Sequence, residues 1–284
     1  MTGPRSSRRP GDGGRRPPRH RIGVFLGGVL VGAMAFSAVV DLAGDTADRW
    51  GVSATWLGED TERPTPRPAE HQDPLGTPLP PPERSGPFEF LATQPDSDTP
   101  VTYDPCRPIP VVVNNLRAPA GSADLLRNSL DRMTEITGFQ FEIEGTTTEV
   151  PDLPRPAYQP ERYGDRWAPV LIIWASEDDV PDLAGYGGLG GSTAAPAPGT
   201  STHVYVSGVV VLNGPSFRDT LTVSRGWFLA EAVILHELGH LLGLDHVDDP
   251  LELMHHDAPE RHDFGTGDLT GLAALSSGPC VDRL

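Results

Sequence analysis

Residues 236–246 read HELGHLLGLDH, and their spacing sets the arrangement of the chain around them. His236 and His240 are four residues apart, so on an α-helix their imidazoles project from one face, one turn above the other. Gly243 follows, and glycine readily adopts the left-handed conformation that ends a helix. The chain can then turn back and bring His246 toward the other two rings. Three neutral imidazoles that leave a fourth position open are typical of a catalytic zinc site.

This segment resembles the long zinc signature of the metzincin metallopeptidases and matches it at every fixed position. The short gap to Met254 is similar to the matrixin branch, in which a methionine turn lies beneath the metal. Residues 268–275 (DLTGLAAL) are similar to the matrixins' C-terminal helix, where an aspartate, here Asp268, braces that turn. The resemblance extends at most from Tyr103 to the C-terminus. It implies an α+β domain with a twisted, mostly parallel sheet, an antiparallel edge strand, a zinc helix and a C-terminal helix.

The resemblance also implies a zinc-dependent endopeptidase that acts on a protein or peptide substrate, with the chain as a monomer. His236, His240 and His246 would hold one Zn2+. Glu237 is not needed as a ligand and would be the general base that takes a proton from the attacking water. The alternative is a non-catalytic zinc-binding module at the cell surface, but such a module has no use for a carboxylate beside the ligands.

The segment after Met254 departs from the matrixin pattern. His255 and His256 stand where matrixins usually have Tyr-Pro, so the pattern does not predict the specificity pocket on this side of the site. His256 lies two residues after Met254, where some other metzincins carry a tyrosine that reaches the zinc. Two interpretations of His256 remain open, a supporting role at the metal and a solvent-facing loop residue.

Charge is distributed unevenly along the 284 residues, whose net charge is −17. Residues 1–21 carry seven Arg and one Asp, a net of +6, which leaves −23 for the remaining residues. Because nothing after this basic arm offers a basic surface for phosphates, nucleic acid is excluded as a partner. The aspartates at 178, 179 and 182 are the one suggestion of a calcium site, although the Gly-rich loop after them lacks the His/Asp-rich character of animal matrixin metal loops.

The N-terminal part reads as an export and tethering region. Residues 1–21 are rich in Arg, Pro and Gly and are expected to form a disordered cytoplasmic arm. Residues 22–40 (IGVFLGGVLVGAMAFSAVV) contain no charge and as a helix would span about 28 Å, so they predict a transmembrane anchor with the C-terminal domain outside the cell. The alternative is a cleaved signal peptide and a secreted protein. Residues 41–100 are Pro-rich and predict a disordered stalk, with a pro-peptide as the alternative. Residues 101–284 are expected to form the zinc metallopeptidase domain.

The chain has two cysteines, Cys106 and Cys280, which bracket the predicted domain. In an exported protein this even number predicts a disulfide. Free thiols in a reducing compartment are one alternative. The other is that Cys106 blocks the zinc in a latent form, as in many matrixins, although the residues around it do not match that family's pro-segment motif.

Hydrophobic periodicity predicts the elements of the domain. Strands are expected at 109–114, 139–143, 170–174 and 203–212, with the third buried on both faces and the second on one. Helices are expected from Ser122 to a stop at Gly138 and over residues 225–243. Residues 184–200 are so rich in Gly that they predict irregular structure. Residues 203–212 read as one or two strands. By resemblance they are the candidate edge strand on which an extended peptide would add, and an ordinary buried strand is the alternative.

Overall fold

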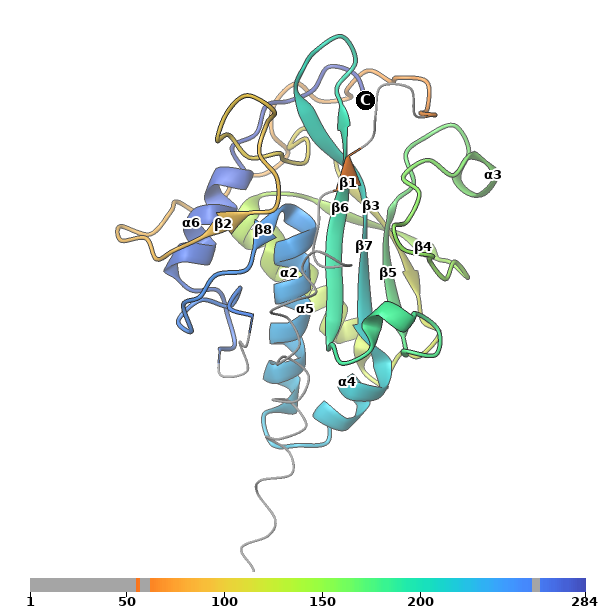
Figure 1. The fold of residues 1–284 in the computed structure, drawn as a ribbon, viewed down its shortest axis with the longest axis vertical. Helices are drawn as coiled ribbons and strands as arrows, with labels where there is room; N and C mark the ends of the chain where they lie inside the picture. The colour runs from red at the N-terminus through yellow and green to blue at the C-terminus, as the bar shows by residue number, and fades with distance from the viewer. Residues whose placement is uncertain (1–54, 57–61, 257–260) are drawn as a thin grey trace, which may run out of the picture.

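The computed structural model describes residues 55–56, 62–256 and 261–284 (Figure 1). A mixed sheet forms the centre, with helices α2, α5 and α6 on one side of it. The strands of this sheet are β1 (Thr55–Trp56), β3 (Ile109–Asn114), β4 (Phe141–Thr146), β5 (Val170–Ala175), β6 (Gly188–Pro196) and β7 (His203–Asn213). The helices are α2 (Ser122–Thr137), α3 (Pro160–Tyr163), α4 (Gly214–Thr220), α5 (Gly226–Leu242) and α6 (Thr266–Leu275), with a 3-10 turn at Pro181–Leu183. A separate pair of short strands is β2 (Glu89–Phe90) and β8 (Leu244–Asp245).

The sheet has the order β1-β6-β7-β5-β3-β4, and all neighbouring pairs are parallel except β6 and β7. The predicted α+β class with a mostly parallel sheet is therefore confirmed. Strand β5 lies inside the sheet and every one of its residues is buried, as its uninterrupted apolar sequence predicts. Helix α2 ends at Gly138 in the left-handed conformation, with φ 75°, again as expected.

The prediction for residues 139–143 was wrong in its details. The strand β4 covers Phe141–Thr146, and four of its six residues are exposed, three of them in succession. Phe139 is buried, but it precedes the strand. Strand β4 pairs only with β3 and lies at the edge of the sheet. The alternation of apolar and polar residues in its sequence therefore does not correspond to one buried and one exposed face.

The Gly-rich segment, which predicted irregular structure, contains the regular strand β6, so that prediction was also wrong. A close contact with another part of the fold explains why these positions are glycine. A Cβ on Gly188 would lie 2.6 Å from Cγ of Glu237, and a Cβ on Gly190 would lie 2.3 Å from the Glu237 carbonyl oxygen. Helix α5 therefore packs so closely on this strand that no larger residue fits.

The strand predicted at residues 203–212 is present, but its edge position was wrong, and the alternative of an inner strand is the one observed. This segment forms β7, which lies inside the sheet between β6 and β5. The antiparallel strand toward that edge is β6, and β1 pairs with it in parallel at Thr193 and Ala194.

Residues 62–100, expected to belong to a disordered stalk, lie against the domain instead. Strand β2 pairs with β8, the amide of Leu79 donates to the carbonyl of Ile136 (2.9 Å), and the amide of Arg67 donates to the carbonyl of Leu284 (2.7 Å). Most of these contacts are backbone hydrogen bonds, which the Pro-rich composition did not indicate. The cytoplasmic arm (residues 1–21) and the predicted membrane segment (residues 22–40) lie outside the described residues. Within the part that is described, no helix has the length and apolar character needed to cross a membrane.

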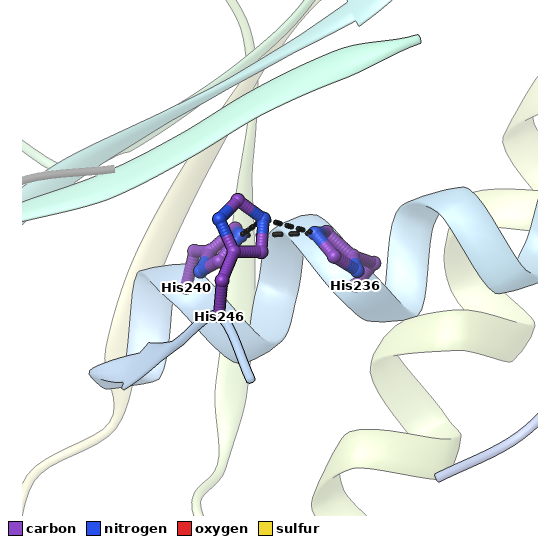
Figure 2. A group of neighbouring side chains, drawn as sticks. All are labelled: His236, His240 and His246. Atoms are coloured by element: carbon purple, nitrogen blue, oxygen red, sulfur yellow. Dashed lines mark hydrogen bonds between the residues drawn. The ribbon is translucent and has the colours of Figure 1, made fainter. Parts of the chain in front are cut away.

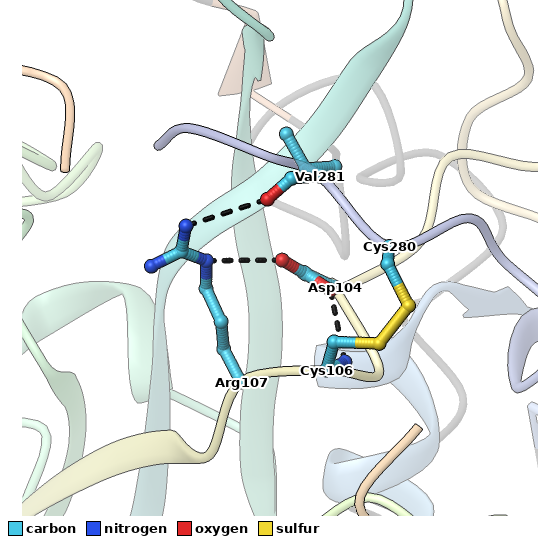
Figure 3. The surroundings of a disulfide bond; sticks show 5 residues. All are labelled: Asp104, Cys106, Arg107, Cys280 and Val281. Carbon is cyan, nitrogen blue, oxygen red and sulfur yellow. Dashed lines mark hydrogen bonds and ion pairs between the residues drawn. A yellow bond between two sulfur atoms is a disulfide. The ribbon is translucent and has the colours of Figure 1, made fainter. Parts of the chain in front are cut away.

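The predicted disulfide is present between Cys106 and Cys280, with a Cα–Cα distance of 5.4 Å (Figure 3). The Asp104 carboxylate accepts from the Cys106 amide (2.9 Å) and pairs with Arg107 (3.0 Å). A guanidinium nitrogen of Arg107 donates in turn to the carbonyl of Val281 (3.3 Å). Because Cys106 is joined to Cys280, it is not a zinc-blocking thiol in this structure.

The two faces of the sheet bury separate apolar clusters. The larger cluster lies on the side of α2, α5 and α6 and includes Trp174, Leu212, Ile234 and Leu238. The smaller cluster lies on the opposite face and consists of Val112, Leu171, Ile173, Ala175, Val180, Leu183 and Val211. Both faces of β5 are thereby covered, and α5 is held on a rigid base.

Candidate metal centre

Helix α5 carries the first part of the site, and its sequence explains its position. The helix is apolar nearly all round, and such a helix must be buried on most sides. It lies between the sheet and the segment that contains Met254. A Cβ on Gly239 would lie 2.6 Å from the Met254 sulfur, so glycine at this position lets the methionine pack directly below the helix. The helix ends at Gly243, which has φ 118° and directs the chain into β8.

The three histidines of the sequence motif come together at the end of this helix (Figure 2). The Nε2 atoms of His236 and His240 are 2.9 Å apart, and the Nε2 atom of His246 lies 3.1 Å from each of them. His240 is buried, whereas His236 and His246 are partly exposed. The exit turn thus brings the third ring back to the helix, as the sequence spacing indicates.

The hydrogen bonds of the Nδ1 atoms of His236 and His240 determine which nitrogen of each ring is free to bind a metal ion. Nδ1 of His236 lies 2.7 Å from the carbonyl oxygen of Leu253, and Nδ1 of His240 lies 2.8 Å from that of Leu244. A carbonyl only accepts, so in both rings Nδ1 carries the proton. The Nε2 atoms of these neutral rings then present lone pairs to each other, and their contact is not a hydrogen bond. A cation between them removes this repulsion.

The protonation states of the three rings favour metal binding. Burial lowers the pKa of His236 to about 3, and the neighbouring His246 lowers it further. Burial is also the main reason why the pKa of His246 falls to about 4 and that of His240 falls well below its usual value. All three imidazoles are therefore neutral near pH 7, which is the form that binds metal.

The donor set fits a divalent transition metal. Three imidazole nitrogens suit zinc, copper, iron or nickel. Two corners of a tetrahedral zinc site are about 3.3 Å apart when zinc–nitrogen distances are about 2.0–2.1 Å. The observed separations of 2.9–3.1 Å are close to this value. His236, His240 and His246 can thus hold one metal ion, and the identity of that ion belongs to the proposal below.

Glu237 lies next to the first ligand and is 6% exposed. Its Oε1 atom would be 2.8 Å from a Cβ on Gly188, so the carboxyl group lies against the first residue of β6. Burial raises the pKa of Glu237 to about 8, and no basic side chain contributes to this shift. A buried carboxyl of this kind exchanges its proton near neutral pH.

The turn that contains Met254 is held by Asp268. The Asp268 carboxylate accepts from the amide of Leu253 (2.5 Å), from that of Met254 (3.4 Å) and from that of Gly265 (2.9 Å). Burial raises its pKa to about 6, and the charge of Glu252 adds to the shift. Leu253 in turn provides the carbonyl that orients His236, so Asp268 acts on the metal site through one intervening residue.

Sequence reasoning missed a second acid in this support. Glu252 is 2% exposed, and its Oε2 atom accepts from the amides of Gly267 (2.9 Å) and Asp268 (3.0 Å) at the start of α6. Asp268 of α6 therefore stabilises the turn at Leu253–Met254, and Glu252 of that turn stabilises the start of α6. No sequence signal was available for Glu252, because it caps the start of a helix that begins at Thr266.

The remaining candidate residues are not members of this three-histidine group. The rings of His255 and His256 stack 4.4 Å apart, and Nδ1 of His256 is 3.6 Å from a carboxylate oxygen of Asp248. Neither histidine belongs to the described metal-binding groups. The calcium hypothesis gains no support either, since Asp179 is bonded through both oxygens to Arg117 (2.8 and 3.0 Å), and none of the three aspartates is in a metal-binding group of the described residues.

Fold and site together define an α+β protein with three histidines arranged to hold a metal ion. A scan against models of known protein families finds no match, and a sequence search finds no match among curated proteins. Membership of the metzincins therefore stays a prediction from the residues of the motif.

Proposed function

We propose that this protein is a zinc-dependent endopeptidase. The observation that carries the proposal is the convergence of three imidazole Nε2 atoms within 3.1 Å of one another, with the buried Glu237 next to His236 in sequence. His236, His240 and His246 would hold the zinc and leave one coordination position open. When bound, zinc polarises the scissile carbonyl and makes a coordinated water more acidic.

Glu237 has the role of general base in this proposal. It takes a proton from the attacking water and then delivers it to the departing amine. Burial raises the pKa of Glu237, and the positive charge of a bound zinc would oppose that rise, so the group could both accept and release a proton near neutral pH. Met254 and Asp268 do not touch the reacting atoms; they keep the helix and the Leu253 carbonyl in place.

The outer edge of β6 is the proposed binding position of the substrate backbone. Among the described residues, this edge is paired only at Thr193 and Ala194, by β1. The stretch Gly188–Ser192 remains available, and its first residue lies against Glu237. An extended peptide that adds there as a further strand would place a peptide bond near the carboxyl group.

The second candidate function is a zinc-binding module without turnover. The buried Glu237 argues against it, because burying a carboxyl that pairs with no basic side chain costs free energy and brings no structural benefit. Casein zymography of the full-length protein, with and without a chelator, separates the two. The peptidase predicts a cleared band that the chelator abolishes, and a protein that binds zinc but clears no casein or peptide library would contradict it.

The proposed cellular location is inferred from the sequence of the N-terminal region and not from the fold. We propose an external C-terminal domain anchored through residues 22–40, with secretion after signal cleavage as the alternative. The disulfide supports an oxidising compartment in either case. Carbonate extraction of membranes followed by detection of the C-terminus distinguishes the two, since only the anchored form stays with the membrane.

A further inference from the structure

One segment of the N-terminal region reaches the metal site although it is far from it in sequence. We define the strap as residues 86–102. Its β2 residues pair antiparallel with β8, which lies directly after the zinc helix: Glu89 with Asp245 and Phe90 with Leu244. The amide of Leu91 then donates to the carbonyl of Gly243 (2.9 Å). The strap therefore holds three consecutive residues of the exit turn of α5.

Two residues of this exit turn contact metal ligands directly. The carbonyl of Leu244 accepts from Nδ1 of His240 (2.8 Å), which sets the tautomer and orientation of that ring. The carboxylate of Asp245 accepts from the amide of His246 (2.7 Å), which fixes the backbone of the third ligand. A displacement of the turn would consequently move His240 and His246 relative to His236.

The strap can hold the turn because both of its ends are fixed. At its start, the strap lies so close to α6 that a Cβ on Gly267 would be 1.9 Å from the carbonyl oxygen of Pro87. At its far end, the Gln94 side chain forms two hydrogen bonds with the backbone of His203, donating at 2.9 Å and accepting at 2.8 Å. The amide of Tyr205 also donates to the carbonyl of Thr102 (3.0 Å). The strap thus spans from the helix that braces the methionine turn to the beginning of β7.

We propose that the strap is a positioning element of the metal site, which sets the exit turn at Gly243–Asp245 and through it the geometry of His240 and His246. The inference rests on the proposed metal binding and not on the peptidase activity. The part of the chain that composition assigned to a stalk is then required for a well-formed metal site. Partners that orient metal ligands typically change metal affinity about 10–100-fold when they are lost.

The first test measures cobalt binding by the full-length chain carrying Leu91→Pro. Proline removes the amide that donates to Gly243. The matched control is Leu79→Pro, which removes an amide donor from the same N-terminal region, at its bond to the carbonyl of Ile136. Leu91→Ala keeps the amide and controls for the loss of the side chain. We expect Leu91→Pro to weaken cobalt binding about 10-fold or more and to alter the visible spectrum of bound cobalt, whereas both controls bind as the wild type does.

A second measurement does not depend on whether Leu91→Pro folds. Coupling between two sites is reciprocal, so if the strap favours metal binding, metal must protect the strap. Hydrogen exchange of the wild-type chain is therefore measured with and without zinc. We expect exchange at Leu91 to slow about 10-fold on zinc addition, while exchange at Leu79 stays unchanged.

The outcomes separate the two proposals. A wild-type chain that binds no cobalt or zinc would overturn the metal site itself. A wild-type chain that binds metal, with equally tight binding by Leu91→Pro and no effect of zinc on the exchange of Leu91, would overturn the strap's role and leave the metal site standing.

Discussion

The two faces of the sheet carry buried polar clusters of opposite character. On the side of α5, three imidazoles direct Nε2 atoms at one another, and Glu237 is buried beside them. On the other side, Glu149 and Arg155 form an ion pair with two hydrogen bonds of 2.7 and 3.0 Å. Tyr163 (2.5 Å) and Gln159 (2.9 Å) donate to the same carboxylate.

The difference lies in charge balance. Burial alone would raise the pKa of Glu149, but the bonds from Arg155, Tyr163 and Gln159 outweigh burial and lower it. Among the described residues Glu237 has no such partner, and burial raises its pKa to about 8. A buried cluster whose donors and acceptors match needs nothing from outside and stabilises the fold. Three Nε2 lone pairs that converge beside a carboxyl group without a basic partner have no matching donor, and this is why we propose a function for one cluster and a structural role for the other.

The largest effect is expected for Glu237→Gln, which removes the general base and keeps the shape of the side chain. Peptidase activity should fall about 10²–10⁴-fold while the zinc content stays at the wild-type level. Measurement of peptide hydrolysis together with metal analysis checks both parts. Retained hydrolysis would remove Glu237 from the mechanism.

Breaking the Glu149–Arg155 pair should lower the stability of the fold and leave the chemistry of the metal site unchanged. Arg155→Ala leaves the Glu149 carboxylate buried without its partner and should lower the free energy of unfolding by about 3–5 kcal/mol, the usual result of breaking a buried pair. Arg127→Ala is the control, since its pair with Asp124 is exposed on both sides and contributes little. Denaturant unfolding measures both variants. Equal stabilities of the two variants would show that Glu149 and Arg155 are not a structural pair.

Metal removal should destabilise the folded protein only through the loss of binding at the three histidines. If free zinc is about 100 times its dissociation constant, binding stabilises the native state by about 2.7 kcal/mol, and a chelator removes this contribution. The loss should have the same size in wild type and in Arg155→Ala, because distant sites act additively. Thermal unfolding with and without chelator tests this, and a chelator effect that disappears in Arg155→Ala would mean that the two clusters are coupled.

A smaller effect is expected from pH through Glu149. Its folded-state pKa is lower than the ordinary value of 4.5, so the folded state holds the charged carboxylate more strongly than the unfolded state does. The stability that Glu149 contributes is therefore fully present above about pH 4.5 and is lost as pH falls through the lowered pKa. Unfolding curves of wild type and Glu149→Gln should converge as the pH is lowered from 5 to 3. Parallel curves over this range would contradict the assignment.

The sequence predicted the convergence of the three histidines well because this information is local. Ligand spacing on a helix, a glycine at the helix end and a third histidine three residues later determine how the rings meet. The support of the site was predictable only in part. Asp268 followed from a family resemblance, whereas Glu252 acts through backbone amides of a helix distant in sequence, which no spacing rule reports.

The sequence failed where tertiary contacts override local preference. Gly188 and Gly190 read as irregular structure, yet they are glycine because α5 lies directly against them. The strap read as part of a stalk because of its Pro-rich surroundings, although Ala92 and Val101 join the main core and backbone hydrogen bonds attach the rest. The pairing of Glu149 with Arg155 likewise depends on a fold that brings a long loop onto β7.

Zinc analysis of the purified full-length chain, set beside its His246→Ala variant, tests the central claim most directly. We predict one zinc ion per wild-type chain and a loss of that zinc in the variant, with unfolding still cooperative in both. A wild-type chain without stoichiometric metal, or a variant that retains the full zinc content, would contradict the assignment of these three histidines as a metal centre.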